Sequence, residues 1–102
     1  MKINDNLRHR LANIAAGDTH FEECRRLTAV PVDTSAQSGR HWRRAAKLYG
    51  MAADFYHRAG LGLRAIAAWQ GAAACHEALG MHADAERCRL KAVSIPVYYG
   101  EE

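Results

Sequence analysis

Residues 45–60 read AAKLYGMAADFYHRAG, and residues 65–80 read AIAAWQGAAACHEALG. When the first stretch is moved forward by twenty positions, an aromatic residue, several alanines and a closing glycine fall on similar residues. The matched pairs are Ala45 and Ala65, Tyr49 and Trp69, Ala52 and Ala72, Ala53 and Ala73, Tyr56 and His76, and Gly60 and Gly80. A weaker third copy continues to Ser94, with Arg89 where the aromatic residue stood. The chain therefore carries an internal repeat.

The repeat has the pattern of one helix followed by one tight turn. Small residues spaced by seven positions let two helix backbones approach closely, and one aromatic side chain per helix fills the space between turns. Glycine directly after a helix is typical of a left-handed cap. We therefore predict that Gly60 and Gly80 divide residues 40–94 into antiparallel helices.

The composition favours helices over strands. The chain has 102 residues, enough for one domain, and twenty of them are alanine. Phe, Trp and Tyr together make up only 8% of the residues, and β-branched residues, which favour strands, are scarce. We predict an all-α fold of four to five helices in a single domain, residues 1–102.

Residues 1–30 are expected to form two short N-terminal helices. An apolar stripe at helical spacing predicts the first helix over residues 5–16, and Gly17 is expected to end it. The run Thr19-His20-Phe21-Glu22 has the form of a capping box, with a hydroxyl followed three residues later by a carboxylate. It predicts a second helix over residues 20–29.

A linker loop is expected between these helices and the repeat. Pro31 disfavours a helical conformation for the residue before it, and residues 31–39 (PVDTSAQSG) are polar and rich in turn-forming residues. The repeat then occupies residues 40–94. Residues 95–102 are expected to form an extended tail.

The order of residue types in the repeat resembles the helical hairpin of the tetratricopeptide family. The residues that carry the resemblance are Leu48, Tyr49, Ala52, Ala53, Tyr56, Ala59, Gly60, Ala65, Trp69 and Ala72. It covers about residues 42–79, lacks the usual closing proline, and spans a longer hairpin than the standard repeat of about 34 residues. The longer SNAP-type adaptors are closer in this respect. The resemblance implies a TPR-like antiparallel helical hairpin stack that binds other proteins. The alternative is an alanine-rich helical bundle with a chance periodicity.

A cluster of charged residues provides the candidate partner-binding site. Between Arg40 and Arg64 the chain has six Arg or Lys residues and one acid. In the tetratricopeptide family the matching helix face lines a groove that binds peptide carboxylates, and cations there would suit an acidic partner. The candidate partner-binding residues are Arg40, Arg43, Arg44, Lys47, Asp54, His57 and Arg58. The alternative is a solvated charged face, which most amphipathic helices have.

Nucleic-acid or anion binding through the basic segment 40–47 is the second candidate. Its cations could neutralise phosphates, and Trp42 could stack on a base. However, the formal net charge of the chain is only +3. Trp42 also falls on the apolar stripe that includes Ala45 and Tyr49. We therefore expect nucleic acid to be the less favoured partner.

The sequence contains no pattern typical of a catalytic, metal or cofactor site. Cys75 and His76 are adjacent, so on a helix they point about 100° apart, and they do not form a zinc motif with His82 and Cys88. The glycines at 60 and 62 lack the lysine of a phosphate-binding loop. We therefore expect a non-enzymatic protein without metal or cofactor.

The remaining features concern location and role. No apolar run reaches membrane-spanning length, the N-terminus lacks a signal-peptide pattern, and three cysteines form no disulfide framework, so we expect a cytoplasmic protein. Abundant alanine and arginine suggest a bacterial gene.

The expected function is protein–protein interaction, as an adaptor, a secretion chaperone or a toxin-neutralising immunity protein. Because short helical repeats cannot bury their outer faces alone, the chain is expected to dock a partner or to form a homodimer.

Overall fold

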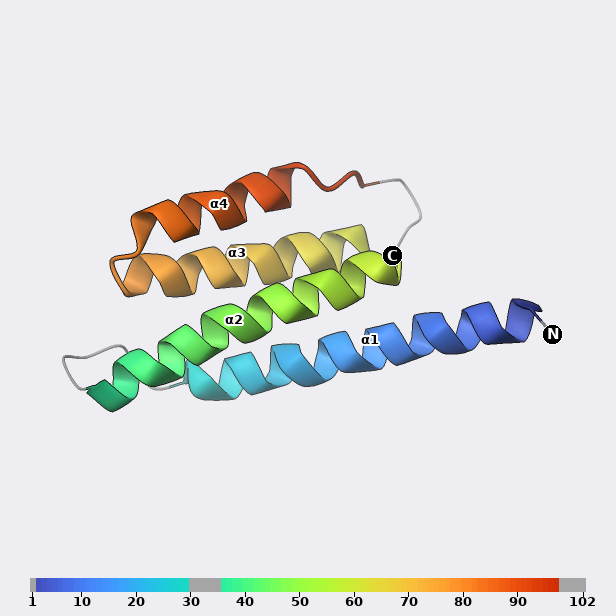
Figure 1. Cartoon of the computed structure of the whole chain (residues 1–102), viewed down its shortest axis with the longest axis horizontal. Coiled ribbons are helices and arrows are strands. Elements are labelled where there is room, and N and C mark those ends of the chain that lie inside the picture. The colour runs from blue at the N-terminus through green and yellow to red at the C-terminus, as the bar shows by residue number, and fades with distance from the viewer. Residues whose placement is uncertain (1, 30–35, 98–102) are drawn as a thin grey trace.

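The computed structural model describes residues 2–29 and 36–97, which form four α-helices and no strand. The helices are α1 (Lys2–Leu27), α2 (Ala36–Arg58), α3 (Gly62–Ala78) and α4 (His82–Val93). They lie side by side in chain order, each antiparallel to the one before it (Figure 1). The resulting stack is elongated and measures 53 × 23 × 17 Å. The prediction of an all-α fold is therefore confirmed.

The two turns within the repeat have the same geometry. Gly60 and Gly80 adopt φ angles of 77° and 74°, which residues other than glycine rarely adopt. At the end of α2, the N–H of Leu61 donates to the carbonyl of Tyr56 at 2.9 Å, and the N–H of Gly60 donates to the carbonyl of His57 at 3.0 Å. After α3, the N–H of Met81 donates to the carbonyl of His76 at 2.8 Å, and the N–H of Gly80 donates to the carbonyl of Glu77 at 2.9 Å. This is the Schellman motif, so the predicted glycine caps are confirmed.

The core consists largely of alanine. The repeat alanines are buried in every copy: Ala45, Ala65, Ala85, Ala52, Ala72, Ala92, Ala53 and Ala73. Tyr56 is the large buried side chain where α1, α2 and α3 meet, and Phe21 and Trp69 pack against the same cluster. Small side chains let the helices approach, and the few aromatic rings fill the remaining volume, as the repeat predicted.

The predicted division of the N-terminal segment into two helices is wrong. α1 continues through Gly17. The absence of a side chain at this position makes room for the ring of Tyr56. A Cβ atom at Gly17 would lie 2.8 Å from the Cε1 atom of the Tyr56 ring. The capping box is also wrong: the Thr19 hydroxyl lies inside the helix and donates to the carbonyl of Ala15 at 2.9 Å. This glycine serves packing between helices and does not end a helix.

The predicted linker is shorter than residues 31–39. α2 begins at Ala36, and the buried Ser38 lies on the stripe of α2 that continues to Ala45. The packing face of the helix therefore begins within the polar segment. The earlier part of the linker and residues 98–102 of the predicted tail lie outside the described residues.

Polar contacts tie α1 to the end of the hairpin. The Tyr56 hydroxyl donates to the Oδ1 atom of Asp18 at 2.5 Å, and Arg64 of α3 lies 3.9 Å from the same oxygen. Further toward the N-terminus, the Nε atom of Arg10 donates to the carbonyl of Ala59 at 2.9 Å. α1 is thus anchored both on a buried side chain and on the turn that follows α2.

The Tyr56–Asp18 hydrogen bond can be tested by removing the hydroxyl. Tyr56→Phe keeps the ring and is expected to lower the free energy of unfolding by about 1 kcal/mol, the usual net contribution of one such bond. Urea unfolding measures the difference. In a double-mutant cycle with Asp18→Ala, the two losses should be less than additive; strict additivity would contradict a direct contribution from the bond.

Candidate functional site

The candidate cations lie along the solvent-exposed side of α2. Arg40, Arg43, Arg44 and Lys47 are all exposed, and their spacing of three or four residues places them on one side of the helix. We refer to these four residues as the cationic face of α2. The exposed Asp54 continues the same side toward the end of the helix.

The cationic face lacks the ion pairs that five arginines of the other helices form. Among the described residues, none of its four cations forms an ion pair, whereas these five arginines on α1, α3 and α4 do. The pairs are Arg25 with Glu22, Arg26 with Glu23, Arg64 with Asp18, Arg87 with Asp84, and Arg89 with both Glu77 and Glu86. The charge of α2 is therefore left uncompensated by these acids.

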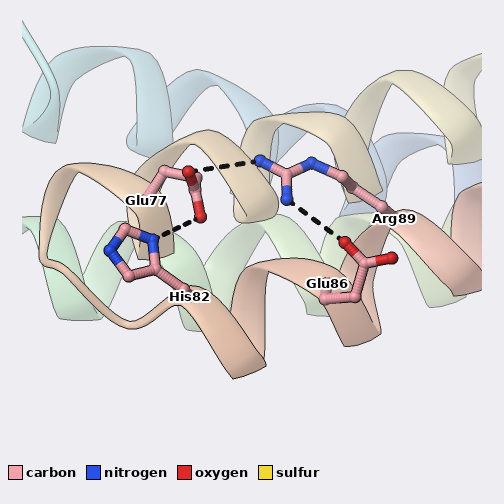
Figure 2. A network of polar contacts seen from close by, with 4 residues as sticks. All are labelled: Glu77, His82, Glu86 and Arg89. Atoms are coloured by element: carbon pink, nitrogen blue, oxygen red, sulfur yellow. Dashed lines mark hydrogen bonds and ion pairs between the residues drawn. The ribbon is translucent and has the colours of Figure 1, made fainter.

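Arg89 illustrates how the acids near the α3–α4 turn are neutralised. Its guanidinium lies between Glu77 of α3 and Glu86 of α4, at 3.6 and 3.5 Å (Figure 2). The Nδ1 atom of His82 lies 2.8 Å from the other oxygen of Glu77. The hydrogen bond from His82 lowers the pKa of Glu77, which favours its charged form. This network joins α3 to α4 and engages Glu77 and Glu86 with Arg89.

Arg58, the last candidate cation, has a local partner. Its guanidinium carbon lies 5.4 Å from the centre of the Phe55 ring, and His20 of α1 stacks against that ring at 5.6 Å. Arg58 also lies at the C-terminus of α2, where a positive charge stabilises the helix dipole. It is therefore less available to a partner than the cationic face.

Asp54 and His57 are brought together in a pocket that α4 completes. This pocket, which we call the α2–α4 pocket, has a volume of about 270 Å³. Its lining residues are Asp54, His57, Trp69, Lys91, Ser94 and Ile95. The ammonium of Lys91 lies 4.5 Å from the centre of the Trp69 ring. The predicted site thus divides into the cationic face, on the N-terminal half of α2, and this pocket beside its C-terminal half.

Gly50 positions the indole at the base of the α2–α4 pocket. A Cβ atom at this position would lie 3.3 Å from the Cζ3 atom of Trp69. The bare backbone therefore lets the edge of the ring approach α2. Gly50 thus shapes the pocket without contributing a side chain.

Trp69, Lys91 and Ser94 were not among the predicted site residues. A signal for Ser94 exists in the repeat, because residues forty positions apart belong to alternate helices that point the same way. Asp54 and Ser94 are related in this manner, and both line the pocket. Applying the repeat twice would have indicated that α4 faces the same side as α2.

A second pocket, of about 230 Å³, lies between α1 and α3. Its lining includes Phe21, Ala67 and the Asp18–Arg64 ion pair, with Tyr56 between them. Burial and the hydrogen bond to Asp18 raise the pKa of Tyr56, so its hydroxyl stays protonated. The polar groups of this pocket are engaged in holding α1.

The three cysteines are buried thiols without a disulfide. Burial raises the pKa of Cys24 to about 12 and the pKa of Cys75 to about 11, so both remain protonated near neutral pH. The Cys24 thiol donates to the carbonyl of Ala45 at 3.3 Å. These side chains act as small packing residues.

Two further observations concern other kinds of site. Within residues 2–29 and 36–97, no three His, Cys, Asp or Glu side chains come together in a way that could hold a metal ion. None of the four helices is both long and apolar enough to cross a bilayer. In comparisons with known proteins, no family model, curated protein or solved structure matches this chain, so its site is described from its own geometry.

Proposed function

We propose that this chain is a protein-interaction module of helical-repeat type whose cationic face on α2 binds an acidic protein partner. The observation that carries the proposal is the absence of ion pairs at the four exposed cations within the described residues, while acids pair with arginines of the other helices. Arginine binds carboxylates through two parallel hydrogen bonds. Uncompensated charge on one face also steers an oppositely charged partner toward it.

The resemblance to tetratricopeptide hairpins supports the same class of function. A cytoplasmic bacterial protein of this kind would act as an adaptor, a secretion chaperone or an immunity protein that blocks a toxin with an acidic surface. Both outer helices of the stack have one uncovered side, which suits docking to a target or to a second copy of the chain.

A matched pair of double variants tests the role of the cationic face. Arg43→Ala with Arg44→Ala removes two unpaired cations, and Arg25→Ala with Arg26→Ala removes two paired ones for the same change in net charge. The probe is a fluorescent peptide of eight glutamates, and anisotropy gives its dissociation constant. We expect the α2 variant to bind about 10-fold more weakly, equivalent to about 1.4 kcal/mol, and the α1 variant to change by less than about 3-fold. Equal losses in the two variants would refute a specific role for α2.

Nucleic-acid binding through the same cations remains the second candidate function. Unpaired arginines and lysine would also suit phosphates. Trp42, however, is partly buried and packs against the cluster that contains Ala46 and Cys24, so its ring is not presented to a base. We expect an eight-nucleotide thymidine strand to bind more weakly than the glutamate peptide at physiological salt. Tighter binding of the nucleotide strand, with a steep loss as salt rises, would favour the alternative.

A further inference from the structure

We infer that the α2–α4 pocket receives one acidic side chain of the partner, which Lys91 binds after its ammonium leaves the ring of Trp69. The inference rests on the proposed function and identifies how the partner is anchored. Lys91 belongs to α4 and Trp69 to α3, so neither residue is part of the cationic face. The pocket would therefore add a second point of attachment at the other half of α2.

The ammonium of Lys91 has an aromatic partner and no acidic one. Lys91 is exposed, and among the described residues its charged group meets the Trp69 ring, 4.5 Å away, and forms no ion pair. A cation–π contact at an exposed site is weak. A carboxylate that reaches the pocket offers the ammonium a charge-assisted hydrogen bond and would therefore compete with the ring for it.

Departure of the ammonium would uncover an apolar surface inside the pocket. Trp69 and Ile95 supply its apolar lining, and the half-buried indole is fixed by its fit against Gly50. The volume of about 270 Å³ corresponds to roughly nine water molecules at about 30 Å³ each. That space is enough for one or two side chains. The methylene groups of a glutamate, or an adjacent aliphatic residue, would cover the ring.

Two other polar groups define how the acidic side chain enters. Asp54 lines the same pocket and repels a carboxylate, so the acid must approach from the side of Lys91. The Ser94 hydroxyl already donates to the carbonyl of Lys91 at 2.8 Å and is engaged within α4. Opposite charges within one pocket mean that Lys91 and Asp54 should affect binding in opposite directions.

The spacing of the two attachment points indicates an extended partner segment. From Arg40 to His57 the axis of α2 covers about 26 Å, at about 1.5 Å per residue. An extended peptide covers about 3.3 Å per residue. Roughly eight residues would therefore reach from the cationic face to the pocket. A peptide of eight glutamates matches this length.

The test measures binding of the eight-glutamate peptide to Lys91→Gln and Asp54→Asn. Both are made in a Trp42→Phe background, so that Trp69 is the only tryptophan and its fluorescence reports on the pocket. In the parent protein, Trp69 fluorescence should change when the peptide binds, because the ammonium of Lys91 leaves the ring. For Lys91→Gln we expect about 5-fold weaker binding and no such change in fluorescence. For Asp54→Asn we expect about 3-fold tighter binding, because a repulsive charge has been removed.

Controls with the same charge changes lie on α1, at the opposite edge of the stack from α4. Arg8→Gln and Asp5→Asn should each change the dissociation constant by less than about 2-fold, since exposed charges farther than about 8 Å from the peptide are largely screened at physiological salt. If Arg43→Ala with Arg44→Ala weakens binding but the pocket variants have no effect, the anchoring role is wrong and the proposed function stands. If the peptide does not bind the unsubstituted protein at all, the proposed function itself fails.

Discussion

Between pH 9 and pH 12 the stability of the protein is expected to fall steeply, because its buried thiols ionise more readily in the unfolded chain than in the folded one. The pKa of Cys24 is raised by burial from 9.0 to about 12, and that of Cys75 to about 11. Above pH 9 the unfolded chain releases these protons while the folded chain retains them. The stabilisation is therefore complete below pH 9 and disappears as the pH rises toward 12.

The size of this effect makes it readily measurable. For Cys24, the difference between 9.0 and about 12 corresponds to about 4 kcal/mol in the free energy of unfolding. A small domain has a total stability of about 5–15 kcal/mol. Urea unfolding followed by circular dichroism at a series of pH values should show a level midpoint up to pH 9 and a steep fall above it.

A variant without the three buried thiols separates them from the other titrating groups. With Cys24→Ala, Cys75→Ala and Cys88→Ala combined, the urea midpoint should stay level to about pH 10, because burial raises the pKa of all three thiols above 9.0 and that of Tyr49 and Tyr56 above 10.0. The two proteins should thus diverge from about pH 9 upward, and between pH 9 and pH 10 the thiols account for the divergence. Parallel curves over that interval would exclude the thiols as the cause.

Gly17→Ala and Gly71→Ala are each expected to lower the free energy of unfolding by about 2 kcal/mol. Inside an exposed helix the same change normally stabilises by about 1 kcal/mol. Here the added Cβ atom would lie 2.8 Å from the ring of Tyr56 or of Tyr49, respectively. Tyr56 is only 4% exposed and its hydroxyl is bound to Asp18, so its ring cannot withdraw freely. Overpacking of this kind typically costs about 1–3 kcal/mol.

Gly39→Ala is the matched control for both substitutions. The nearest atom to its added Cβ would be a terminal nitrogen of Arg43, at 3.3 Å, and an exposed arginine can move away. We expect this change to raise the free energy of unfolding by about 0.5–1 kcal/mol. The contrast in sign, measured by urea unfolding, is the essential result. A similar gain in all three variants would mean that the tyrosine rings do not require these glycines.

The glycines also show how far the fold could be predicted from the sequence. Gly60 and Gly80 each follow the last alanine or leucine of a repeat, and the apolar pattern restarts after them, so their role as caps was predictable. At Gly17 the apolar stripe continues from Ile14 to Phe21 without a change of phase. That continuity was the available signal for one long helix, but the ring that occupies the space beside Gly17 comes from a residue far away in the chain.

The candidate site was predictable to a similar extent. Helical periodicity places Arg43 and Lys47 in solvent, and the absence of an acid three or four residues away leaves them without a local partner. By contrast, Glu22 precedes Arg25 by three residues, and the two are paired. The α2–α4 pocket depends on three helices meeting at Trp69, and that geometry does not follow from periodicity along any one of them.

The end of the stack at α4 is built differently from its centre. Val93 is 81% exposed, although Ala53 and Ala73 at the same position of the earlier copies are buried. α4 is also the shortest helix, with 12 residues, and packs chiefly on α3. Unfolding of α4 alone would therefore break chiefly one helix–helix interface, as expected for chains whose units contact mainly their nearest neighbours. Because Lys91 belongs to this terminal helix, a ligand that bridges α2 and α4 would stabilise the packing of α4 against the rest of the stack.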